Sequence, residues 1–155
     1  MNIMTKEDVI KRLEESKFAV LATSDKDGNV SASQMCLIND GLDVYFQTDK
    51  SSEKISNIKE NNKVAINIGS MYFKGVAKIV GHPTKSPKFI ELIKEKHLKT
   101  YTNYTSLPNE ILIKVKLVEC KLWDAEVDNP IENKKFIAVY NLLNDKQKTI
   151  VCDKM

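Results

Sequence analysis

The chain has 155 residues, with 24 lysines and arginines against 21 aspartates and glutamates, and a net charge of +3. This length fits one domain with its own hydrophobic core, so we expect residues 1–155 to form a single domain. The lysines alternate with acidic residues and no apolar run approaches the length of a membrane helix, so we expect neither a nucleic-acid nor a membrane partner. The N-terminus lacks the apolar segment of a signal peptide, and three widely spaced cysteines favour reduced thiols in a cytoplasmic protein.

The first half of the chain predicts one helix and three strands. Thr5 and Asp8 form a capping box before a narrow apolar stripe, which predicts a packing helix over residues 5–16. Short runs rich in apolar residues predict strands at 18–24, 30–39 and 43–48. The turn sequences between them, Asp25-Lys26-Asp27-Gly28 and Asn39-Asp40-Gly41, favour tight hairpins. We therefore expect these three strands to form an antiparallel meander.

The second half predicts further strands around two helices. We expect helices at 53–61 and 87–99, strands at 64–69, 73–80 and 111–123, polar loops at 100–109 and 124–133, and a last strand or short helix at 136–143. Ser86 and Pro87 are preferred residues for a helix start, and Gly75 predicts a bend or bulge. About six strands with tight turns predict a mainly β fold with flanking helices, a six-stranded antiparallel closed or split barrel.

The stretch from Asp43 to Ile68 contains the candidate site. A strand ends there in a polar turn that opens a helix, and the first N–H groups of a helix lack internal partners and attract anions. Thr48, Ser51 and Ser52 can donate hydroxyl hydrogen bonds to an anion, and Lys54 adds a full charge. These residues alone also allow a plain N-cap at Ser52 and a solvated Lys54. No P-loop or dinucleotide fingerprint is present.

Two motifs with their flanking strands resemble a known family. The first is A-T-x-D-x-D-G, which starts at Ala22, and the second is Y-F-x-T-x-x-x-S-x-K-x-x-N-I-x-x-N-x-x-V-A, which starts at Tyr45. Their order is similar to that of the pyridoxamine 5′-phosphate oxidase-related, FMN-binding split-barrel family, over residues 18–80 and again near Trp123. The resemblance implies a split barrel that binds FMN at the interface of a homodimer.

The same resemblance implies roles for particular residues. Thr48, Ser52 and Lys54 match the positions that hold the FMN phosphate in the family. The flavin ring is implied to lie over the second strand and beside the third, at Ser33, Gln34, Met35, Cys36 and Gln47. Trp123 matches a tryptophan that approaches the flavin from the partner subunit, although a lone tryptophan equally suits core or interface packing.

The sequence also departs from the oxidases proper. Residues 30–38 contain no lysine or arginine, and Glu53 stands where an arginine precedes the family's lysine. The phosphate pocket is therefore expected to be weaker, unless Lys50 or Lys74 contributes. After the tryptophan the chain has acidic residues at 124–128 where oxidases bind the substrate's phosphate, and carboxylates repel a phosphorylated substrate. We therefore expect no true pyridoxamine-phosphate oxidase activity.

Three functions remain open from the sequence. The first is an FMN-dependent oxidoreductase that passes hydride or electrons between the flavin and a small unphosphorylated substrate. The second is a flavin- or haem-binding storage or sensor protein without turnover, and the third is a barrel that has lost its cofactor. His82 and His97 lie in no ligand spacing, so no metal site is expected, and no catalytic side chain can be assigned.

Overall fold

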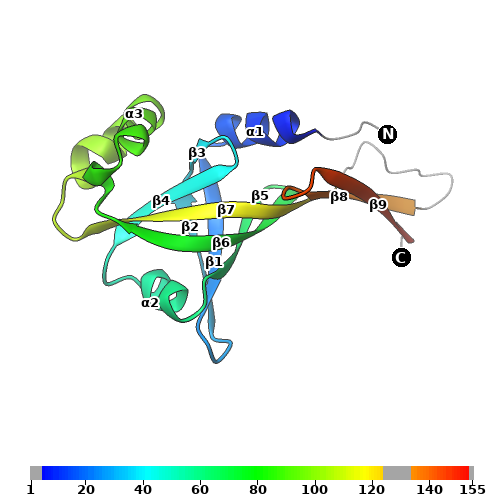
Figure 1. Cartoon of the computed structure of the whole chain (residues 1–155), viewed down its shortest axis with the longest axis horizontal. Helices are drawn as coiled ribbons and strands as arrows, with labels where there is room; N and C mark the ends of the chain where they lie inside the picture. Colours follow the sequence, from blue (N-terminus) through cyan, green and yellow to red (C-terminus); the bar gives the residue numbers. More distant parts are fainter. Residues whose placement is uncertain (1–4, 124–133, 154–155) are drawn as a thin grey trace.

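The computed structural model describes residues 5–123 and 134–153. One antiparallel nine-stranded sheet dominates it, with helices around its rim (Figure 1). The strands are β1 Phe18–Ser24, β2 Val30–Cys36, β3 Ile38–Asp40, β4 Asp43–Asp49, β5 Lys63–Ile68, β6 Met71–Gly81, β7 Glu110–Trp123, β8 Lys134–Asn141 and β9 Lys146–Asp153. The helices are α1 Lys6–Glu15, α2 Glu53–Glu60, the 3₁₀-helix η1 Pro83–Lys85, α3 Pro87–Lys96, α4 Leu98–Thr100 and the π-helical turn η2 Tyr101–Thr105.

The sheet curls into a split barrel. Its strand order is β2-β1-β5-β6-β7-β4-β3, and the strands at the two ends, β2 and β3, are joined in the chain by the single residue Leu37. The curl therefore brings the two ends of the sheet together at this residue. The mainly β class with flanking helices and the split-barrel architecture are confirmed.

The expected second strand is divided. Residues 30–39 form β2 and β3 with a break at Leu37, whose side chain is fully buried. The N–H of Leu37 donates to the carbonyl of Lys17, and His97 Nε2 lies 3.3 Å from the carbonyl of Leu37. These partners take the place of the strand-to-strand hydrogen bonds that a continuous strand would make at Leu37. As a result, β2 pairs only with β1, while β4 pairs with β3 and β7. The predicted meander of three consecutive strands is therefore wrong.

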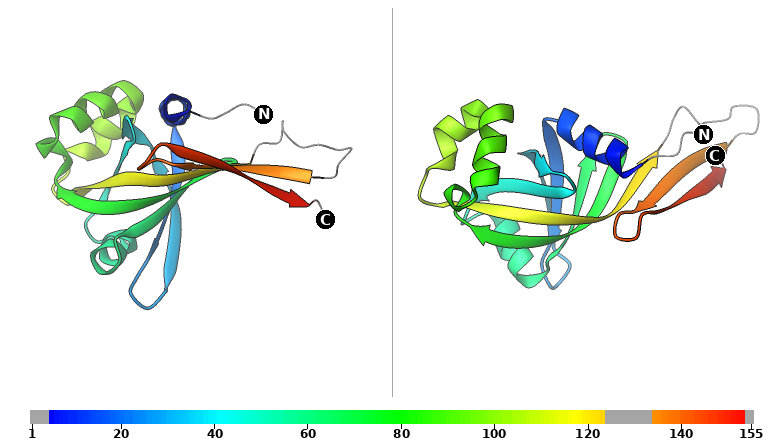
Figure 2. Two further views of the ribbon diagram at one scale, coloured as in Figure 1. Left: turned by 45° about the vertical axis from the view of Figure 1, so that its right-hand side comes forward. Right: turned by 45° about the horizontal axis from the view of Figure 1, so that its top comes forward.

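Two other segments differ from expectation. Residues 100–105, expected to belong to a loop, are helical because tertiary contacts order them: Thr105 is fully buried, and Lys94 Nζ lies 4.9 Å from the centre of the Tyr101 ring. The tail adds β9, for which no strand was expected, and residues near 136–143 adopt the strand alternative as β8. The β8–β9 hairpin extends β7 away from the barrel (Figure 2). These two strands, with the division of the expected second strand into β2 and β3, bring the six expected strands to nine.

Local signals elsewhere are confirmed. The capping box at Thr5 is formed, with its hydroxyl accepting from the N–H of Asp8 at 3.1 Å and the Asp8 carboxylate accepting from the N–H of Thr5. The Ser86 side chain caps α3. Gly75 lies at a shift in the β6–β7 register, where an added Cβ would come within 2.5 Å of Val115 Cγ1. Glycine is therefore required there by close approach rather than by its backbone angle.

The core has two parts. The interior of the barrel is filled by large side chains such as Leu21, Phe46 and Phe73, and the apolar faces of α1 and α2 join it from opposite ends of the barrel (Figure 1). Outside the barrel, Phe89 and Ile93 of α3 pack on β3, β4 and β7. This second cluster holds α3 and α4 beside the junction of the sheet's two ends, which is where the candidate site lies.

Candidate functional site

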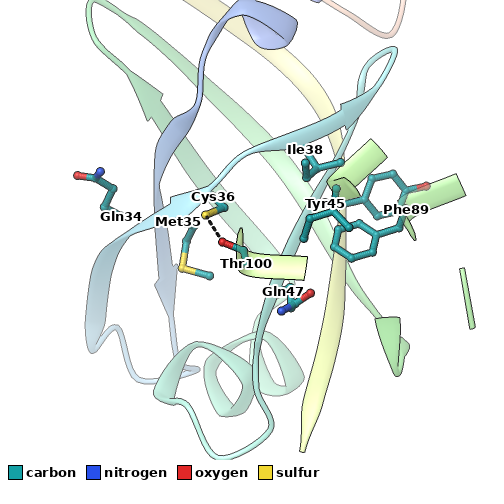
Figure 3. A pocket seen from close by; sticks show the side chains of 9 residues that line it. Gln34, Met35, Cys36, Ile38, Tyr45, Gln47, Phe89 and Thr100 are labelled. Atoms are coloured by element: carbon teal, nitrogen blue, oxygen red, sulfur yellow. Dashed lines mark hydrogen bonds between the residues drawn. The ribbon is translucent and has the colours of Figure 1, made fainter. Parts of the chain in front are cut away.

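A cavity of about 190 Å³ opens at the junction between β2 and the β3–β4 hairpin (Figure 3). It is lined by Gln34, Met35, Cys36, Ile38, Tyr45, Gln47, Phe89, Ile93 and Thr100. The curl of the sheet thus brings together β2, β3 and β4 with α3 and α4. Four of these residues were expected beside a flavin from the resemblance, three on β2 and one on β4: Gln34, Met35, Cys36 and Gln47. Their contact with a cofactor stays a prediction.

Gln47 is held in a fixed orientation. Its Oε1 accepts a hydrogen bond of 2.8 Å from the hydroxyl of Thr105, which is fully buried. In Figure 3 the amide nitrogen of Gln47 lies on the side of Met35, and the amide oxygen lies on the opposite side. The side chain therefore turns N–H donors toward the cavity. Sequence reasoning missed Thr105, because nothing in the local sequence marks a threonine whose partner lies 58 residues away.

The β2 side of the cavity is rich in sulfur. Cys36 Sγ lies 3.7 Å from the hydroxyl oxygen of Thr100, and the hydroxyl of Ser33 donates to Met35 Sδ at 3.6 Å. Ser33 does not line the cavity, unlike its three neighbours on β2. Cys36 is half-buried, so its thiol is accessible from the cavity.

The candidate phosphate site is a pair of hydroxyls at the start of α2. Thr48 Oγ1 donates to Ser52 Oγ at 3.2 Å, and the side chain of Ser52 makes no capping bond to the helix. The N–H groups of Glu53 and Lys54 have no protein partner within the described part of the chain. The Ser52 hydroxyl proton and both N–H groups can therefore bind an anion at a helix N-terminus, and the Thr48 hydroxyl, whose proton is held by Ser52, would have to turn to reach the same anion. The hydroxyl of Ser51 instead donates to Asp49 at 2.6 Å.

A buried polar network fixes α2 against the barrel. Asn57 Nδ2 donates to the hydroxyl oxygens of Thr23 at 3.0 Å and Ser31 at 3.4 Å, and these two oxygens lie 3.1 Å apart. The network joins α2 to β1 and β2, so the candidate phosphate site and the sulfur-rich strand have a set relative position. Asn57 is part of the second sequence motif, but the motif did not reveal this role.

The remaining candidates are engaged elsewhere or are not described. Lys74 Nζ lies 3.7 Å from Glu119 Oε2 across β6 and β7. Lys50 is exposed and uses its backbone N–H to bind the carbonyl of Asn109. Trp123 ends β7, but its side chain is not among those that the structure describes, and the acidic residues 124–128 also lie outside the described residues.

Both histidines have structural partners. The ring of His82 lies 2.7 Å from the Thr84 hydroxyl oxygen and 2.8 Å from the Leu107 carbonyl. Burial lowers the pKa of His97, which contacts the Leu37 carbonyl. Over residues 5–123 and 134–153, no cluster of three or more His, Cys, Asp and Glu side chains is arranged to hold a metal ion. In the same ranges, no helix combines the length and hydrophobicity needed to cross a lipid bilayer.

The two parts of the site differ in chemistry. The hydroxyl pair and the α2 N-terminus suit a phosphate, and the cavity with its N–H donors and apolar walls suits part of a flavin ring with carbonyl acceptors. Cavities that enclose a ligand of this size usually measure about 300–1,000 Å³. The cavity of one chain is therefore smaller than a pocket that encloses such a ligand.

Fold and site together define a split-barrel protein with a pair of hydroxyls at a helix start and an open cavity at the junction of the sheet's ends. A sequence profile described as pyridoxamine 5′-phosphate oxidase matches residues 5–124. The chain belongs to this family. A comparison with curated proteins gives no match.

Solved structures share the fold at low sequence identity. An FMN-binding, pyridoxamine 5′-phosphate oxidase-related protein of Nostoc punctiforme PCC 73102 superposes with a TM-score of 0.64 at 12% identity, over 99% of this chain and 100% of that one. HutZ, a haem storage protein from Vibrio cholerae, superposes with a TM-score of 0.59 at 19% identity, over 74% and 91%. ChuZ from Campylobacter jejuni gives a TM-score of 0.72 at 14% identity, over 93% and 62%. The family therefore includes FMN-binding members, and the same fold also serves haem storage.

Proposed function

We propose that this protein binds FMN between two copies of the chain and passes hydride or electrons between the flavin and a small unphosphorylated substrate. The observation that carries the proposal is the hydroxyl pair of Thr48 and Ser52 at the start of α2, which makes no capping bond to the helix and lies on the same strand-turn-helix segment as Gln47. FMN, when bound, supplies the redox chemistry itself. The protein's residues bind, orient and shield it.

The proposed roles of the residues follow from their chemistry. Thr48 and Ser52 donate hydroxyl hydrogen bonds to the phosphate, together with the backbone N–H groups at the helix start, and Lys54 neutralises part of its charge. Gln47 presents N–H donors to the ring end. The apolar walls formed by Ile38 and Phe89 exclude water from it. No described residue is assigned as a catalytic acid or base.

A phosphate-free ligand tests the phosphate site. Riboflavin has the same ring as FMN but no phosphate, so the wild-type protein is expected to bind FMN at least about tenfold more tightly than riboflavin, because charge-assisted hydrogen bonds are lost. A Ser52→Ala/Lys54→Ala double variant is expected to lose most of this preference while its riboflavin affinity stays the same. Lys59→Ala, on the same helix but in its last turn, is the matched control. An FMN preference that survives the double variant contradicts the assignment.

The uncharged face of β1 and β2 supports the homodimer. Neither strand contains a charged residue, whereas solvated sheet faces normally carry them. Phe18 is 49% exposed and Val30 is 77% exposed on this surface. Since β2 also borders the cavity, a second copy seated on this face would both cover the apolar side chains and complete the cavity. Sedimentation equilibrium is expected to give a dimer, and Ala32→Glu at the exposed centre of β2 is expected to give monomers that bind FMN poorly.

Haem binding is the second candidate. HutZ shows that this fold can serve haem storage, and Met35, Cys36 and Tyr45 border the cavity with side chains of the kinds that ligate haem iron. Titration of the protein with FMN and with haem distinguishes the two candidate functions. FMN is expected to bind and haem to bind weakly or not at all, and the reverse order favours storage of haem without turnover.

A further inference from the structure

Thr105 and Gln47 form a contact that the proposed FMN site does not by itself explain. Thr105 lies in the π-helical turn η2, is fully buried, and donates 2.8 Å to Gln47 Oε1. Single π-helical turns are rare and often occur at functional sites. The turn follows α4, whose Thr100 lines the cavity. Segment 98–105 therefore approaches the cavity at one residue and anchors one of its walls at another.

The contact selects one orientation of the Gln47 amide. If the amide were turned over, the Thr105 hydroxyl would accept from the amide N–H, and its own proton would need another acceptor. Among the described residues, the hydrogen bond to Gln47 Oε1 is the one that the structure gives this hydroxyl. A buried hydroxyl proton without a partner is costly, so the observed orientation is favoured. The amide nitrogen then lies on the cavity side, toward Met35 (Figure 3).

We propose that Thr105 is a positioning residue that keeps the N–H donors of Gln47 turned to the flavin. This inference rests on the proposed FMN site. An amide that can turn over offers a flavin carbonyl either a donor or a repelling oxygen, whereas an anchored amide offers only the donor. A fixed donor beside the ring also stabilises the negative charge that the ring gains on reduction, so it raises the reduction potential of bound FMN.

Two substitutions at Thr105 test the proposal. Thr105→Val keeps the shape but removes the hydroxyl, and Thr105→Ser keeps the hydroxyl. We expect Thr105→Val to weaken FMN binding about fivefold, the value of one neutral hydrogen bond, and to lower the reduction potential of the bound flavin. Thr105→Ser is expected to stay within about twofold of wild type in affinity and to keep the wild-type potential. Thr105→Cys, with a weaker donor, replaces the valine variant if circular dichroism shows that the latter does not fold.

A double-mutant cycle separates positioning from a merely structural role. In a Gln47→Ala background the amide is absent, so adding Thr105→Val is expected to change FMN affinity less than twofold. An undiminished fivefold loss in that background overturns the proposal, as does a Thr105→Val protein with wild-type affinity and potential. If the wild-type protein itself binds no FMN, the proposed function fails and this inference fails with it. If the wild type binds FMN but the valine variant does not differ, only the inference fails.

Discussion

At the scale of single residues, Glu110 carries an unfavourable charge. It is buried at the start of β7, and its Oε2 atom has no hydrogen-bond partner within the described residues. Burial, and then the nearby Asp49 carboxylate, raises the pKa of Glu110 above its usual 4.5. The folded protein therefore binds this proton more tightly than the unfolded chain does. The contribution of Glu110 to stability is fully present below about pH 4.5 and is lost as the pH rises through its folded-state pKa.

Glu110→Gln is expected to remove the loss of stability that the Glu110 charge causes at neutral pH. The free energy of unfolding of the variant is expected to exceed that of wild type by about 1 kcal/mol at pH 7, which is the order of the cost of an unpaired buried group. At pH 4 the two free energies are expected to differ little. Urea unfolding at the two pH values measures both numbers. An equal gain at both pH values would show that the charge is not the cause.

The cysteines are expected to react unequally. Cys120 is fully buried, which raises the pKa of its thiol to about 12, whereas Cys36 is half-buried and lines the cavity. In a Cys152→Ser background, a thiol reagent is expected to label Cys36 at least about tenfold faster than Cys120, because only an accessible thiolate reacts. Added FMN is expected to slow the labelling of Cys36. Mass spectrometry of the labelled peptides identifies the site, and labelling of Cys36 that FMN leaves unchanged would argue against a flavin in this cavity.

At the scale of elements, Asn57 links the helix that starts at the hydroxyl pair to strands β1 and β2. Asn57→Ala leaves the hydroxyls of Thr23 and Ser31 without their amide partner and opens a small gap, so a loss of about 1–3 kcal/mol in stability is expected. FMN affinity is also expected to fall, because the start of α2 is no longer held against the barrel. Ser56→Ala, on the exposed side of the same helix, is the control and is expected to change neither quantity.

Helices, strands and bulges could be predicted from the sequence where neighbouring residues determine them. Helix starts at Thr5 and Ser86 and the bulge at Gly75 depend on residues close in sequence or on the lack of a side chain, and each was found. The division of the second strand at Leu37 and the helical turn at 100–105 were not predictable. Both depend on partners far along the chain, such as His97 for the Leu37 carbonyl and Gln47 for Thr105.

At the scale of the whole molecule, the cavity exists only because the sheet curls until its ends meet. Its walls come from β2, β3, β4, α3 and α4, so residues from Gln34 to Thr100 line it. The family resemblance identified the parts on β2 and β4, since these lie in the matched motifs. It did not identify Phe89, Thr100 or the anchor Thr105, because helices packed outside the barrel follow no motif and reach the cavity only through the second apolar cluster.

The central claim is that the site binds FMN. The most direct test is the visible absorption spectrum of the purified protein, recorded as isolated and again after incubation with FMN and desalting. The account predicts flavin bands that persist through desalting in wild type and are lost in the Ser52→Ala/Lys54→Ala variant. A protein that stays colourless after FMN treatment, or one that shows a haem Soret band and displaces FMN, would contradict it.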